Sequence, residues 1–266
     1  MNNFALGRYL PLDSVVHKMD PRSKIMIMLF MMISVFVPAG VYGYAIIALF
    51  VILALVLSKL SIGYALKAMK PMLFMMGFLF VINLLVIKTG TPLIKIGWFS
   101  IYSDAIYQTL YVVVRLLFMV VITTILTATT KPLDLTLGIE KLLKPFEKIG
   151  IPAHIIAMMI SIALRFIPTL LEETQRIMNA QASRGVDLEN GTLKEKISAL
   201  LSLIVPLFVS AFERADQLAN AMEARGYNPN KTRTRYKVLK MQAIDYVAML
   251  ISVLVMAACF GIWLYV

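Results

Sequence analysis

Long apolar stretches dominate the chain and alternate with short polar connections. Five of these stretches fall near residues 25–38, 41–57, 72–87, 105–129 and 242–266. A helix needs about 20 apolar residues to cross a hydrocarbon layer about 30 Å thick, so all five fit membrane spans, some of them on the short side. The pattern therefore predicts about five transmembrane helices, the first two joined by a tight, uncharged turn.

Basic residues next to these stretches gather on one side of the predicted membrane. That side carries Arg8, Lys18, Arg22, Lys24, Lys59, Lys67, Lys70 and everything from Lys131 to Lys240. The other side has little beyond Lys88 and Lys95. Because connections rich in lysine and arginine stay in the cytoplasm, we expect a multi-pass protein of the cell membrane with its N-terminus cytoplasmic and its C-terminus outside.

Two further apolar runs, residues 151–164 and 197–208, complicate this count. Fourteen helical residues reach only about 21 Å, which is short of a full crossing. If both runs crossed, two nearly identical sequence motifs that follow them would face different compartments. We therefore expect both runs to lie at or just under the cytoplasmic leaflet, with a seven-span protein as the alternative.

Each of these runs leads into an amphipathic segment with apolar residues every three or four positions, one from Ile167 and one within a helix of about 30 residues that starts near Lys194. Both segments end on the pattern Asn-Ala, three residues, Arg-Gly, at residues 179–185 and 220–226. Glycine just past a helix end accepts the left-handed conformation, and arginine there faces the negative end of the helix dipole. A single copy is an ordinary helix cap.

Two copies favour a second interpretation, a duplicated surface for a partner. A helix end that carries a fixed cation suits a groove on a soluble protein, where a carboxylate orients the arginine. Paired grooves indicate a dimeric partner, and in membrane transport such a partner is usually a pair of ATPase subunits.

Composition supports a membrane protein and excludes several chemistries. The chain is 60% hydrophobic with a mean hydropathy of +0.81, far above a soluble domain, and its net charge of +11 fits a cytoplasmic membrane surface better than a nucleic acid. One cysteine, Cys259, and two histidines, His17 and His154, form neither a disulfide framework nor a metal cage. The sequence has no phosphate-binding loop and no zinc-protease motif, so we expect no catalytic residue, metal or cofactor.

Several segments together resemble the transmembrane T component of energy-coupling factor (ECF) transporters, over most of the chain. The segment GRYLPLDSVVHKMDPRSK resembles the start of that family, with Ser14, His17, Asp20, Pro21, Arg22 and Lys24 in place. TATTKPLDL at 127–135 resembles the element after the fourth span, and IEKLLKPFEKIGIP and ALRFIPTLLEE resemble its coupling helices. SRG at 183–185 and ARG at 224–226 occupy the places of the paired x-Arg-Gly motifs, with serine for alanine in the first.

This resemblance implies a set of partners and of contact residues. Two ABC-type ATPases would dock one on each motif, through Ser183, Arg184, Gly185, Ala224, Arg225 and Gly226. ATP-driven closure would then move the long helices and topple or release a membrane S component, which alone binds the vitamin or metal ion. The chain itself would be a non-catalytic subunit of the transport complex.

The resulting prediction is an all-α integral membrane protein with about five transmembrane helices and a coupling domain of about three helices. Residues 1–130 are expected to hold four spans, residues 131–240 the cytoplasmic coupling helices, and residues 241–266 the last span. The alternative is a self-sufficient secondary transporter or channel, which would need facing polar groups or broken, inverted repeats in its spans. The predicted spans hold few polar residues beyond Asn83, Gln108, Arg115 and threonines.

Two local features complete the predictions. Asp20 and Pro21 read as the cap and first residue of a helix. Arg115 lies about 16 Å into a span that begins at Asp104, and an arginine inside a membrane is a candidate functional residue. Because the span is long, the alternatives are a position near the outer interface or a polar neighbour that pairs with Arg115.

Overall fold

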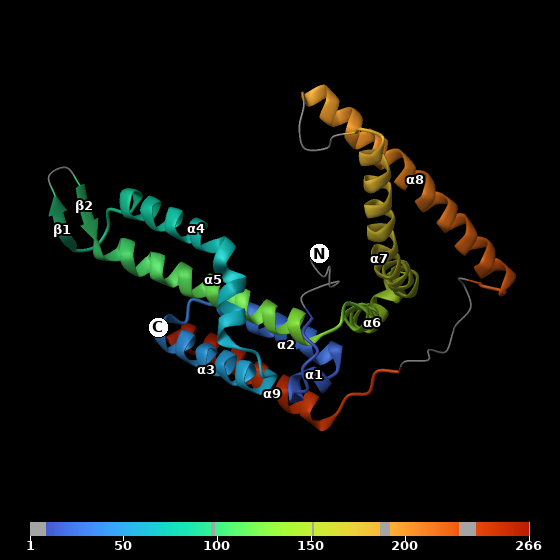
Figure 1. Cartoon of the computed structure of the whole chain (residues 1–266). Helices are drawn as coiled ribbons and strands as arrows, with labels where there is room; N and C mark the ends of the chain where they lie inside the picture. Colours follow the sequence, from blue (N-terminus) through green and yellow to red (C-terminus); the bar gives the residue numbers. More distant parts are fainter. Residues whose placement is uncertain (1–8, 97–98, 151, 187–191, 229–237, 266) are drawn as a thin grey trace. The chain divides into compact units, whose positions relative to one another are not determined.

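The computed structural model describes residues 9–96, 99–150, 152–186, 192–228 and 238–265 (Figure 1). In chain order its elements are α1 (Val15–Lys18), α2 (Pro21–Phe36), α3 (Gly40–Ser58), α4 (Ile62–Val86), β1 (Pro92–Ile96), β2 (Phe99–Tyr102), α5 (Ser103–Thr129), α6 (Pro132–Leu143), the 3-10 helix η1 (Lys144–Ile149), α7 (Ala153–Ser183), α8 (Leu193–Ala224) and α9 (Ala243–Tyr265). They form two compact units. We call residues 1–142 and 239–266 the bundle unit and residues 143–238 the long-helix unit.

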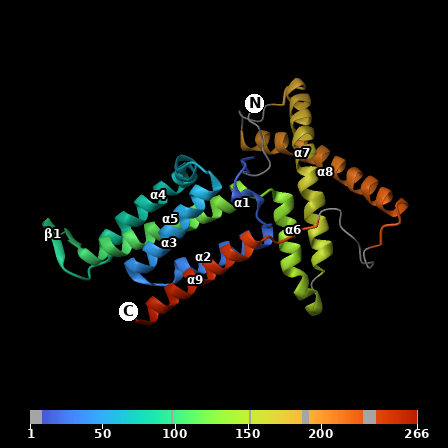
Figure 2. The same ribbon diagram turned by 90° about the horizontal axis from the view of Figure 1, so that it is seen from below.

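The bundle unit is built around α2, α3, α5 and α9. Helix α2 packs along α9 and against α5, while α3 contacts both α5 and α9 (Figures 1 and 2). Its core is made of aliphatic, aromatic and sulfur-containing side chains: Met31, Val35, Ile47, Val51, Phe118, Val255 and Cys259. The first and last long helices of the chain therefore share one core, although the whole long-helix unit lies between them in sequence.

Helix α4 extends along α5 and leads into a two-stranded antiparallel hairpin. Pro71 lies inside α4, and Asn83 Nδ2 donates a hydrogen bond of 3.0 Å to Thr109 Oγ1 of α5. Strands β1 and β2 pair from Pro92↔Tyr102 to Ile96↔Phe99. The all-α prediction included no strand, so this hairpin is an addition to the expected helices.

The spans predicted at 41–57, 72–87, 105–129 and 242–266 agree with α3, α4, α5 and α9, and the all-α membrane class is confirmed. The span predicted at 25–38 coincides with α2, which is not among the described helices long and apolar enough to cross a membrane. By length and composition, six described helices could cross a membrane: α3, the Lys67–Val86 part of α4, α5, α7, α8 and α9. Helix α2 has 16 residues and reaches only about 24 Å. It is the shortest of the predicted spans.

In the long-helix unit, residues 151–164 and 197–208 are not separate from the amphipathic segments that follow them, which corrects the expectation for the first run and agrees with it for the second. They belong to continuous helices of 31 and 32 residues, about 46 and 48 Å long, that also contain the amphipathic segments. Pro168 and Pro206 are accommodated inside these helices. The predicted length of the second helix, about 30 residues, is confirmed.

Helix α8 presents a row of large apolar side chains that its own unit leaves uncovered. Its start is fixed by a capping box, in which Thr192 and Glu195 hydrogen-bond each other's backbone N–H groups. Exposed along its first half are Ile197, Leu200, Leu201, Ile204, Val205, Phe208 and Phe212. A row of this extent indicates contact with lipid or with another protein.

Candidate functional site: two matched helix ends

The first candidate site is the end of α7. Arg184 is the cap residue with φ −89° and ψ 5°, and Gly185 follows with φ +83°. The backbone N–H of Gly185 donates to Ala182 O over 3.0 Å, and that of Val186 donates to Gln181 O over 3.0 Å. This pair of bonds is the Schellman motif, which requires a left-handed residue where the glycine lies.

The second candidate site, at the end of α8, repeats this geometry. Arg225 has φ −86° and ψ 8°, and Gly226 has φ +69°. Gly226 N–H donates to Glu223 O over 2.9 Å, and Tyr227 N–H donates to Met222 O over 2.9 Å. The repeated sequence therefore folds into two matched caps, as the glycine positions predicted.

All six predicted contact residues at these ends are exposed: Ser183, Arg184, Gly185, Ala224, Arg225 and Gly226. In the part of the chain that the structure describes, neither guanidinium has a hydrogen bond or an ion pair to another side chain. Each cap is closed by backbone groups alone, so both arginine side chains are available to a partner.

Two polar contacts fix how α7 and α8 cross. Arg214 Nη2 lies 3.0 Å from Glu173 Oε2, and Gln181 Nε2 donates to Ser202 O over 3.1 Å. The end of α7 thus lies beside Ser202, while Arg225 lies 23 residues further along α8, about 35 Å away. The two arginines are therefore presented at two separate places on the long-helix unit.

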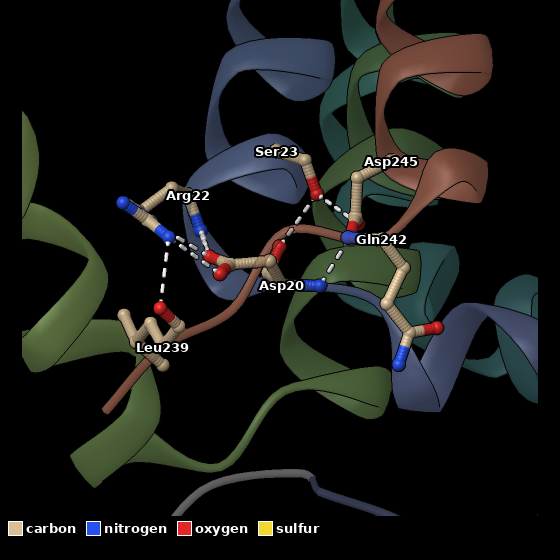
Figure 3. A network of polar contacts seen from close by, with 6 residues as sticks. All are labelled: Asp20, Arg22, Ser23, Leu239, Gln242 and Asp245. Carbon is tan, nitrogen blue, oxygen red and sulfur yellow. Dashed lines mark hydrogen bonds and ion pairs between the residues drawn. The ribbon is translucent and has the colours of Figure 1, made fainter. Parts of the chain in front are cut away.

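Sequence reasoning missed a buried polar network where α2 and α9 begin (Figure 3). The carboxylate of Asp245 is fully buried and accepts three hydrogen bonds: from Asp20 N at 2.9 Å, Ser23 Oγ at 2.7 Å and Gln242 N at 2.7 Å. An aspartate among the first residues of an apolar stretch was the available signal.

The predicted cap of α2 is confirmed. The Asp20 carboxylate accepts from Arg22 N over 2.9 Å and forms an ion pair of 2.9 Å with the Arg22 guanidinium, and Pro21 opens the helix. Burial by itself raises the pKa of Asp20, but the hydrogen bonds and charge of Arg22 outweigh it and hold the pKa below its ordinary value. Of the N-terminal family-like segment, Gly7 and Arg8 lie outside the described residues.

The first turn of α2 also holds two distant parts of the chain. Arg22 Nη2 donates to Leu239 O over 3.3 Å, just before α9, and Lys24 Nζ donates to Thr129 O over 3.0 Å, at the end of α5. Leu239 is the residue at which the chain returns to the bundle unit, and Thr129 ends the helix that precedes α6, through which the chain leaves it. One helical turn therefore contacts both the returning segment and the end of α5.

The remaining candidates, His17 and Cys259, are not placed in a catalytic or metal-binding cluster of described residues. His17 contacts Ser14 Oγ at 2.7 Å and Leu10 O at 3.0 Å, and Cys259 is buried in the core. Among the described residues, no group of three or more histidine, cysteine, aspartate or glutamate side chains is placed to hold a metal ion.

Comparison with known proteins extends over nearly the whole chain. A family model described as cobalt transport protein matches residues 13–236. The chain is 45% identical over 248 residues, 93% of each chain, to a Thermosediminibacter oceani protein named energy-coupling factor transporter transmembrane protein EcfT. Proteins of the same name from Bacillus subtilis and Lactococcus lactis subsp. cremoris are 41% and 39% identical, over 97% and 99% of this chain and 97% and 98% of theirs.

Loss of the Asp245 carboxylate is expected to destabilise the bundle unit. Asp245→Ala removes the acceptor of Asp20 N and Gln242 N and one of the two acceptors within reach of Ser23 Oγ, which costs about 3 kcal/mol and lowers Tm by roughly 6–12 °C. The Tm of Asp245→Asn is expected to lie between those of the native chain and Asp245→Ala, because the amide keeps one oxygen acceptor while its NH2 group faces a donor. Thermal unfolding in detergent measures the shift, and Asp216→Ala, an exposed aspartate of α8, is the control. Equal Tm values for the two alanine variants would contradict the assigned role.

The two caps are expected to need glycine for its backbone conformation. Alanine at Gly185 or Gly226 meets no atom within 4 Å but is strained at positive φ, so each change should cost about 1 kcal/mol locally. Hydrogen exchange of the last helical turn should accelerate about fivefold. Asparagine at either position should accelerate exchange less than alanine, because it tolerates a positive φ better. The control is Gly63→Ala, which also has open space around it but an ordinary φ, and it should not accelerate exchange. Unchanged exchange in both alanine variants would contradict the cap assignment.

Proposed function

This chain belongs to the family of energy-coupling factor transporter transmembrane proteins, and from that membership we propose that it couples two ABC-type ATPases to micronutrient uptake. In this proposal a separate membrane S component binds the vitamin or metal ion. The chain is the non-catalytic scaffold between them. The observation that carries the proposal is the pair of matched, exposed Arg-Gly helix ends.

The geometry of these ends suits a dimeric partner. Each guanidinium stands on a closed helix cap, where its charge is unpaired among the described side chains and its direction is limited by a rigid helix. A carboxylate in a groove would receive it through a charge-assisted hydrogen bond. Because the two ends are about 35 Å apart along α8, they suit one groove on each of two subunits, with Ser183–Gly185 at one and Ala224–Gly226 at the other.

The proposed topology follows from the separate roles of the membrane domain and the coupling helices. Residues 1–130 and 241–266 form the membrane domain, and residues 131–240 carry the coupling helices on the cytoplasmic side. The N-terminus is then cytoplasmic and the C-terminus outside. The exposed apolar row of α8 supports this placement, because it offers a membrane surface or a membrane partner a contact that water would disfavour.

Charge reversal at the helix ends tests the proposal. The chain carrying Arg184→Glu and Arg225→Glu is expected to lose two co-purifying P-loop ATPases, because removing one partner from a buried charge pair costs about 3–5 kcal/mol. Each single reversal should weaken assembly and leave the other contact. Neither change disturbs the backbone bonds of the caps, so Tm of the isolated chain should stay the same. Co-purification in mild detergent, with identification of the bound proteins, measures the effect.

Arg165→Glu is the matched control, because Arg165 is an exposed arginine of α7 distant from its Arg-Gly end. It should retain both ATPases. If the double reversal retains them as well, the Arg-Gly ends are caps and not docking points. If the native chain purifies alone and moves a solute across vesicles without ATP, the coupling role is wrong and a secondary transporter is the better description.

A further inference from the structure

Arg115 is an isolated charge in the middle of α5. It is the single charged side chain between Asp104 and the end of this helix at Thr129. Its Nε donates to the Tyr44 hydroxyl over 3.3 Å, and its guanidinium carbon lies 5.8 Å from the centre of the Phe36 ring. The helices α2, α3 and α5 each contribute one of these three residues.

These contacts leave the charge of Arg115 unbalanced. A guanidinium has five N–H donors, and the described contacts use one of them. No described carboxylate lies within ion-pair distance, although the residue is half-buried in a helix apolar enough to span a membrane. A cation in such surroundings is stable only with a counter-charge or a route to water. Phe36 and Tyr44 orient the group without neutralising it.

The position of Arg115 along the bundle indicates where that counter-charge comes from. Lys24 meets Thr129 at one end of α2 and α5. From that end, Phe36 is 12 residues along α2 and Arg115 is 14 residues back along α5, about 18 and 21 Å respectively. Arg115 therefore lies level with the turn between α2 and α3, where the hairpin of these two helices ends.

The side chains around this turn are typical of a membrane–water interface. Phe36 is 57% exposed and Tyr42 is 76% exposed, and both flank the turn at Val37–Ala39. The rings of Tyr44 and Tyr111 are in contact, with their centres 5.5 Å apart and their planes tilted by 47°. Aromatic rings concentrate at the level of lipid headgroups, where phosphate is the abundant anion.

We propose that Arg115, oriented by Tyr44 and Phe36, binds the phosphate of a phospholipid headgroup at the end of the α2–α3 hairpin. The planar guanidinium offers its two terminal nitrogens as a fork that matches two phosphate oxygens. The acyl chains then lie along exposed apolar side chains of the neighbouring helices. This site is independent of the helix ends of α7 and α8 and of the partners proposed for them.

Lipid binding to the full-length chain tests the site. Native mass spectrometry from detergent measures the retention of dioleoylphosphatidylglycerol and, in a parallel titration, of dioleoylglycerol, which has the same chains and no phosphate. The phosphate lipid is expected to bind saturably and the neutral one not. Arg115→Leu should weaken binding of the phosphate lipid roughly tenfold to a hundredfold. Arg115→Lys should weaken this binding less, and Tyr44→Phe should weaken it about threefold. Arg176→Leu, which removes an exposed arginine of α7, is the control and should bind like the native chain.

Thermal unfolding supplies the second readout and shows that each variant is folded. Added dioleoylphosphatidylglycerol should raise Tm of the native chain and of Arg176→Leu, and leave Tm of Arg115→Leu nearly unchanged. Equal lipid retention by Arg115→Leu and the native chain would overturn the proposal. So would an equal Tm increase from inorganic phosphate, which would make the site one for free anions. Loss of a protein subunit, instead of lipid, from the Arg115→Leu complex would identify an acidic partner residue as the counter-charge and would equally overturn it.

Discussion

The buried carboxylate of Asp245 determines where the bundle unit closes on itself. The chain leaves this unit after residue 142 and returns at residue 239. Helix α9 therefore packs against α2, although Asp245 and Asp20 are 225 residues apart in sequence. Asp245 links the two helices, because its carboxylate accepts hydrogen bonds from residues at the start of α2 and at the start of α9. Both helix N-termini direct their positive dipole ends at one anion, which stabilises a charge that burial alone would make unfavourable.

At the matched helix ends, the structural role of the motif does not conflict with the recognition role proposed for it. The glycine closes the cap through backbone bonds, and the arginine side chain takes no part in them. A protein can therefore keep the cap while the exposed arginine meets a partner, and the crossing contacts Glu173–Arg214 and Gln181–Ser202 hold the two ends at their separation. This is why the cap interpretation and the docking interpretation are compatible.

Features that depend on neighbouring residues could be predicted from the sequence. The spans, the Asp20–Pro21 start of α2 and the glycine-capped ends follow from apolar runs and local backbone preferences. The role of Asp245 could not be predicted, because its partners are distant in sequence and carry no local signature. The length of α7 was underestimated, since the apolar run and the amphipathic segment were read as separate pieces, whereas the structure continues the helix through Pro168. The β1–β2 hairpin was missed because it is short and lies between two long apolar helices.

The first turn of α2 contacts three other parts of the bundle unit: the segment before α9, the end of α5 and helix α6. Arg22 holds the segment before α9, Lys24 holds the end of α5, and Gly138 lets α6 approach so closely that a Cβ there would lie 3.1 Å from side-chain atoms of Pro21 and Ile25. A force that enters the bundle unit through α6 or at residue 239 therefore reaches the same helical turn. Because α2 is packed along both α5 and α9, the turn cannot shift without carrying these helices with it. We therefore expect the bundle unit to resist such a force as one body, which is what the proposed scaffold role requires.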